Sequence, residues 1–215
     1  MFRGATVKSS PRACTRGTGC DDSRVQRRRT PKATAKPGCE VFILAGGQSR
    51  RMGRDKARAR IGRSPMLALV SAAATSAGLR VRIVRRDAVP RCGPMGGVVT
   101  ALRRSRADAL VFLACDMPFV PPALIRKIAG LMRGRTTAAF VTQRRVAGFP
   151  FALRRGALRV AGALIARGEF SLQSLARETG AKQVRVSGAA LRALANVNTR
   201  EDLERARIRA GGRKR

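Results

Sequence analysis

The sequence predicts a single-domain α/β fold built around a mostly parallel sheet. Two apolar runs, Val41 to Ala45 and Leu110 to Ala114, carry no polar side chain, as is typical of strands buried on both faces of a parallel sheet. Strand-like and helix-like segments then alternate along the chain, which favours parallel strands joined by right-handed crossovers. A length of 215 residues allows one sizeable core plus a tail.

The remaining elements follow from local patterns. We expect strands at 81–84, 138–142, 149–153 and 183–186, and helices at 66–77, 98–104, 121–133, 157–166, 172–178 and 200–209. Ser64 and Pro65 are expected to supply the N-cap and first position of the helix at 66–77. Residues 93–97 predict a tight turn before the helix at 98. The strands on either side of Arg144-Arg145 are expected to pair. Thr199 and Asp202 match a capping box.

Residues 1–39 form a basic segment without a periodic apolar pattern, which predicts a disordered tail ahead of a domain at 40–215. Arg27-Arg28-Arg29 would suit an electrostatic anchor, and the acid-poor composition faintly resembles a transit peptide. A mis-assigned start codon explains the segment equally well, and we favour a dispensable tail.

The composition limits the chemistry. A net charge of +34 suits nucleic acid, an anionic membrane or phosphate-rich ligands, but abundant arginine and alanine also fit a solvated surface from a GC-rich coding sequence. Aromatic residues are 4% of the chain, too few for the stacking platforms of single-strand binders, so a nucleic-acid partner is not favoured. No apolar run approaches the length of a membrane span.

The chain has no histidine, which excludes histidine-based nucleophilic catalysis and histidine-ligated metals. The five cysteines show neither a C-x-x-C pair nor a zinc spacing, which favours reduced thiols in the cytoplasm.

The stretch from Val41 to Lys56 organises the prediction of function. Gly46 and Gly47 end a buried strand, and Arg50, Arg51 and Lys56 follow, an arrangement that suits a phosphate but also describes a solvated basic turn. The Walker and Rossmann spacings are both absent.

Two carboxylates are expected near this turn. Asp116 follows the strand at 110–114, at the carboxyl edge where open α/β sheets bind ligands, and Asp87 follows the strand at 81–84. Asp116 suits Mg²⁺, which prefers one or two carboxylates together with phosphate oxygens and water. Capping of the next turn is the alternative for each aspartate, more so for Asp87.

The segment Leu44-Ala45-Gly46-Gly47-x-Ser49-x-Arg51-Met52-Gly53-x-Asp55-Lys56 resembles the signature of the molybdenum cofactor guanylyltransferases, which have a Rossmann-like nucleotidyltransferase fold. Later blocks resemble that family in the same order: Gly93-Pro94-Met95-Gly96-Gly97, Cys115-Asp116-Met117-Pro118-Phe119 and Asn196-Val197-Asn198-Thr199-Arg200-Glu201-Asp202-Leu203. The likeness covers roughly residues 41–205.

The resemblance implies Mg²⁺-dependent transfer of GMP from GTP to molybdopterin. It implies that Leu44, Ala45, Gly46, Gly47, Arg51, Lys56 and Asp87 bind the nucleotide, with Lys56 and Asp116 catalytic. Asp116 would bind Mg²⁺, and Asn196 and Asn198 would line the acceptor side. Gly47 favours guanine, because cytidylyl relatives tend to carry alanine there.

The chain departs from the family pattern in two places. The segment between Val84 and Asp87 is short, and Phe149-Pro150 stands where the family often has His-Pro. A nucleotidyltransferase with another base or acceptor therefore stays an alternative, as does a basic nucleic-acid-binding protein on a degenerate transferase scaffold.

Overall fold

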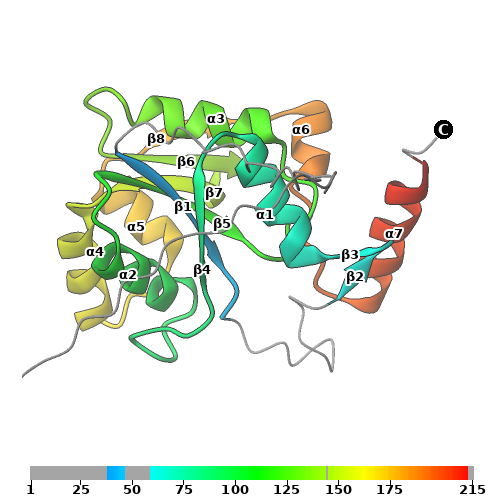
Figure 1. Cartoon of the computed structure of the whole chain (residues 1–215). Helices are drawn as coiled ribbons and strands as arrows, with labels where there is room; N and C mark the ends of the chain where they lie inside the picture. The colour runs from blue at the N-terminus through cyan, green and yellow to red at the C-terminus, as the bar shows by residue number, and fades with distance from the viewer. Residues whose placement is uncertain (1–37, 47–58, 144, 213–215) are drawn as a thin grey trace, which may run out of the picture. The chain divides into compact units, whose positions relative to one another are not determined.

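The computed structural model describes residues 38–46, 59–143 and 145–212. These residues all belong to one compact unit, Ala33–Arg215. Six of its strands are β1 (Cys39–Leu44), β4 (Arg80–Val84), β5 (Ala109–Ala114), β6 (Ala138–Gln143), β7 (Val146–Arg154) and β8 (Lys182–Arg185). They form one sheet in the order β4-β1-β5-β7-β6-β8 (Figure 1).

The sheet is mostly parallel, as predicted. β1 lies between β4 and β5 and is parallel to both, and β6 is parallel to β8. β7 runs antiparallel to β5 and β6, because the short connection after β6 forms a hairpin. The carboxyl ends of β1, β4, β5 and β6 therefore meet at one edge of the sheet, which is where an α/β fold binds ligands.

The helices of the described residues cover the sheet and its flank: α1 (Met66–Ser76), α2 (Pro94–Arg104), α3 (Pro122–Leu131), α4 (Ala157–Ala166), α5 (Leu172–Glu178), α6 (Gly188–Ala193) and α7 (Arg200–Gly211). One apolar cluster packs α1 and α3 on Val41 and Ile43 of β1. A second packs α2, α4 and α5 on the opposite face, where Phe42 points. Val41, Phe42 and Ile43 thus alternate between opposite cores, which explains why this run of β1 carries no polar side chain.

A third, smaller cluster joins α7 to the start of α1 and to the two-residue strand β2 (Arg60–Ile61), which pairs with β3 (Ser64–Pro65). Ile61, Met66, Val197 and Ala206 are its buried members. Because Val197 belongs to it, the segment before α7 is anchored to the body of the domain.

Two of the expected boundaries were wrong. Residues 93–97 were expected to form a turn, yet α2 begins at Pro94, with Gly93 as its N-cap at φ 53°. Proline at the first helical position starts the helix early, and Gly96 and Gly97 are buried within it. Ser64 was expected to cap α1, but the N-cap is Pro65, because Ser64 pairs with Ile61 across β2 and β3.

Other local expectations were confirmed. β6 and β7 pair around Arg145, and Thr199 and Asp202 form a capping box at the start of α7. Among the described residues, no helix combines the length and the apolar character needed to cross a membrane.

Candidate active site

The loops that leave β1, β4 and β5 are tied to one another at the carboxyl edge of the sheet. The Ala45 amide donates to the Val84 carbonyl at 2.8 Å, and the Cys115 amide donates to the Leu44 carbonyl at 3.3 Å. Leu44 and Ala45 are half-buried, and Gly46 is exposed. The glycine turn expected after the first strand therefore begins at this edge, between the two neighbouring loops.

Asp87 lies against this turn. Its Oδ1 atom is 3.3 Å from the place that a Cβ atom would occupy on Gly46, and equally 3.3 Å from the corresponding place on Gly97. The same position on Gly97 is 3.1 Å from the Leu44 side chain. The carboxylate thus occupies a notch between β1 and the first turn of α2, and the two glycines leave room for it.

The notch removes water from part of this carboxylate. Burial raises the pKa of Asp87 above the usual value of an aspartate, because desolvation disfavours the charged form. Around it the loop carries exposed cations at Arg85, Arg86 and Arg91. A partly desolvated carboxylate at a ligand edge, on a loop rich in arginine, is the kind of group that binds a polar ligand.

Asp116 and the 196–198 segment lie next to each other. Asp116 is half-buried, with its Oδ1 atom shielded from solvent, and its carbonyl accepts a hydrogen bond from the Val197 amide at 2.9 Å. The Asp202 carboxylate accepts from the amides of Asn198 and Thr199, each at 3.0 Å. The structure therefore brings Asp116 beside the residues predicted for the acceptor, Asn196 and Asn198.

The model of the MobA-like NTP transferase domain matches residues 41–186, about two thirds of the chain. The chain belongs to this family. A relative from Pseudomonas entomophila, named molybdenum cofactor guanylyltransferase, is 33% identical over 135 residues, which are 52% of this chain and 67% of that protein. A probable molybdenum cofactor guanylyltransferase from Haloferax mediterranei is 37% identical over 117 residues, or 44% of this chain and 55% of that protein.

A solved structure has the same fold. The molybdopterin-guanine dinucleotide biosynthesis protein A from Archaeoglobus fulgidus superposes with a TM-score of 0.65 at 18% identity, covering 80% of this chain and 99% of that one. The Rossmann-like nucleotidyltransferase fold expected from the motifs is thereby confirmed. The sequence matches span only about half to two thirds of the two relatives named above.

Several of the predicted site residues lie at one edge of the sheet, and others fall outside the residues that the structure describes. Leu44, Ala45, Gly46, Asp87 and Asp116 all lie at the carboxyl edge of strands β1, β4 and β5. The predicted site residues Gly47, Arg51 and Lys56 lie outside the described residues.

The packing role of Gly96 and Gly97 was missed from the sequence. Gly96 and Gly97 were assigned to a turn, yet they form the helical surface against which the Asp87 loop packs. The consecutive glycines, one residue after the Gly93-Pro94 pair, were the signal that a backbone approaches closely there. Phe149, in place of the family's histidine, is half-buried, and its ring lies 5.0 Å from that of Phe151.

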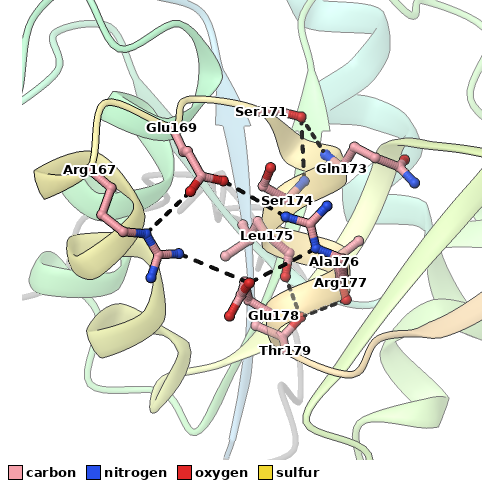
Figure 2. Close-up of polar contacts among 10 residues, drawn as sticks. All are labelled: Arg167, Glu169, Ser171, Gln173, Ser174, Leu175, Ala176, Arg177, Glu178 and Thr179. Carbon is pink, nitrogen blue, oxygen red and sulfur yellow. Dashed lines mark hydrogen bonds and ion pairs between the residues drawn. The ribbon is translucent and has the colours of Figure 1, made fainter.

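A separate pocket of about 290 Å³ lies between α5 and the β6–β7 hairpin and contains none of the predicted site residues. Its Arg177 is already engaged with Glu169 and Glu178, which also contact Arg167, closing a ring of four charges (Figure 2). Exposed pairs of this kind contribute little to stability and leave Arg177 poorly available to a ligand. The glycine turn is therefore the better candidate site.

The carboxylates fit a magnesium ion that shares its coordination with phosphates. Among residues 38–46, 59–143 and 145–212, no three of His, Cys, Asp and Glu gather as a metal cage. Mg²⁺ needs no such cage, because it retains waters and binds through one or two carboxylates together with substrate phosphates. Asp116 has the donor type and the position for this role.

Proposed function

We propose that this protein transfers GMP from GTP to molybdopterin, or to its molybdenum-bearing form, releasing pyrophosphate. The proposal rests on family membership and on one observation above all. One edge of the sheet carries Gly46, Asp87 and Asp116. A hydrogen bond from Val197 to Asp116 brings the segment before α7 to the same edge. Donor and acceptor would thus meet beside Asp116.

The reaction asks little covalent chemistry of the protein. An oxygen of the acceptor's terminal phosphate forms a bond to the α-phosphorus of GTP, while the bond from that phosphorus to the bridging oxygen breaks and pyrophosphate leaves. The nucleophile is already anionic, so no general base is needed, which suits a chain without histidine. The protein has to position the two phosphates and neutralise their charge.

Each part of the site has a proposed task. The turn at Leu44, Ala45 and Gly46 would contact the nucleotide along its backbone, and Asp87 would bind it from the side of β4. By motif, Arg51 and Lys56 would neutralise the phosphates. A Mg²⁺ ion held by Asp116 would stabilise the charge that develops on the α-phosphate and the leaving pyrophosphate.

The acceptor side would be formed by Asn196 and Asn198. The Val197 amide between them donates to the Asp116 carbonyl, and the Asn198 amide donates to the Asp202 carboxylate. Amide side chains can donate and accept hydrogen bonds, as the mixed edges of a pterin require. We also propose guanine as the base and the cytoplasm as the location.

Direct binding titrations with several ligands separate this function from its alternatives. The full chain, at physiological salt with Mg²⁺, is titrated with GTP, CTP and ATP, and separately with duplex DNA at rising salt. A preference for GTP supports the proposal, and a preference for CTP or ATP assigns a different base. Steeply salt-dependent DNA binding without nucleotide binding would establish the nucleic-acid alternative.

A further inference from the structure

Thr100, in the second turn of α2, is a buried polar residue with only 1% of its surface exposed. Its hydroxyl donates to the Gly96 carbonyl at 2.7 Å, one helical turn back, as threonines in helices commonly do. The same oxygen also accepts the Ala88 amide at 2.7 Å. This second bond reaches outside the helix, to the residue directly after Asp87.

The loop that carries Asp87 lies flat on α2. A Cβ atom on Gly96 would come within 2.4 Å of the Val89 carbonyl oxygen and 3.1 Å of the Asp87 Cβ atom. The Thr100 hydroxyl holds the loop at Ala88, between these two points of contact. Three consecutive loop residues are therefore fixed against the first two turns of α2.

A restraint of this kind is needed here. Burial makes the charged form of Asp87 less stable in its notch than in water, which its raised pKa reflects. The carboxylate would gain hydration by swinging outward, and Ala88 itself is exposed. The hydrogen bond from Thr100 opposes that movement.

We infer that Thr100 is a positioning residue, which holds Asp87 in the nucleotide site through the Ala88 amide. The inference rests on the proposed nucleotide-binding role of Asp87. Thr100 itself touches no substrate in this scheme. Its loss would make the position of Asp87 less defined and would weaken nucleotide binding.

The first test compares Thr100→Val with Thr100→Ser in the full chain. Valine keeps the shape and removes both hydrogen bonds, whereas serine keeps the hydroxyl. We expect Thr100→Val to raise the Kd for GTP by about 3- to 10-fold, the size of one lost hydrogen bond, and Thr100→Ser to stay within about twofold of wild type. Water can reach the Ala88 amide, so the melting temperature should change little.

Thr179→Val is the matched control. Thr179 also donates back to a helix carbonyl, that of Leu175, at 2.7 Å, but it lies at the end of α5 (Figure 2). Its replacement should cost similar stability and leave the Kd for GTP unchanged. An equal loss of GTP affinity in Thr179→Val would overturn the inference, because the effect would then follow from general destabilisation.

A double-mutant cycle tests whether Thr100 acts through Asp87. In an Asp87→Ala background, Thr100→Val should change the Kd by less than about twofold, since the positioned group is gone. Hydrogen exchange of the Ala88 amide should accelerate in Thr100→Val and not in Thr100→Ser, with or without nucleotide.

The two proposals fail in different ways. If wild type binds GTP and Thr100→Val binds it equally well, or weakens it by the same factor with and without Asp87, the positioning role is wrong. Unchanged exchange at Ala88 would contradict it too. If wild type binds no GTP, the proposed function itself is overturned.

Discussion

Replacing Gly96 by alanine tests the packing that places Asp87. The added methyl group would lie 2.4 Å from the Val89 carbonyl oxygen, and real Cβ contacts essentially never fall below 3.0 Å. The neighbour is backbone, not the flexible end of a side chain, so it cannot rotate away. The loop must therefore lift, and Asp87, whose own Cβ atom is 3.1 Å from the new methyl, must move with it.

Two effects oppose each other in this variant. Alanine favours a helix over glycine by about 0.5–1 kcal/mol. Overpacking a tight contact costs about 1–3 kcal/mol, and here it also strains the Ala88–Thr100 hydrogen bond. We expect the clash to win by about 1 kcal/mol, which lowers the melting temperature by about 2–4 °C. Affinity for GTP should fall on the order of tenfold or more, because sub-ångström errors in position are costly at a binding site.

Gly162→Ala provides the control. Gly162 lies within α4, and nothing stands within 4 Å of the place that its Cβ would take. This variant should gain about 0.5–1 kcal/mol from helix propensity alone and bind GTP as wild type does. Both variants are measured by thermal melting and by titration with GTP. If Gly96→Ala gains stability as Gly162→Ala does, with an unchanged Kd, the loop does not pack as described.

Three further predictions concern single charges. Asp116→Asn keeps the turn but removes the charge for the metal, so turnover at limiting Mg²⁺ should fall by roughly 10²-fold with little change in melting temperature; near-normal turnover would place the metal elsewhere. Lys56→Ala should weaken GTP far more than GMP, and equal losses in parallel titrations would refute its phosphate role. Asp202→Asn tests acid stability. Backbone hydrogen bonding, chiefly from Asn198, lowers the pKa of Asp202 below 3.8. The charged carboxylate therefore stabilises the fold fully above pH 3.8, and this stabilisation is lost as the pH falls through the lower pKa of the folded state. Wild type should melt at a higher temperature than Asp202→Asn at neutral pH, and this difference should vanish in acid. A difference in melting temperature that stays constant with pH would mean that the carboxylate's charge does not contribute.

Much of the fold could be predicted because its strands and longer helices carry strong local patterns. The apolar run of β1 is dictated by cores on both of its faces, and the capping box at Thr199 is a local signal that tertiary packing leaves intact. β2, β3 and α6 were not expected. Strands of two residues and a helix of six are too short to show a period.

The candidate site also has a part that could be predicted from the sequence and a part that could not. The positions of Asp87 and Asp116 could be predicted because each follows closely on the carboxyl end of a strand, where the ligand edge of the sheet lies. The roles of Gly96 and Thr100 could not, since they depend on how the loop after β4 folds back onto α2. The adjacent glycines indicate a close backbone approach without naming the partner, and Thr100 gives no local signal. The Val197–Asp116 hydrogen bond joins residues far apart in the chain and likewise left no local signal.

One reaction tests the central claim most directly. Purified full chain is incubated with Mg²⁺, molybdopterin and GTP labelled at the α-phosphate, beside a reaction with GTP labelled at the γ-phosphate. The account predicts that the α-label moves into a guanine dinucleotide form of the acceptor while the γ-label appears only in pyrophosphate, and that omitting molybdopterin abolishes both products. Release of the γ-label as inorganic phosphate, or an acceptor that stays unlabelled while GTP is bound, would contradict it.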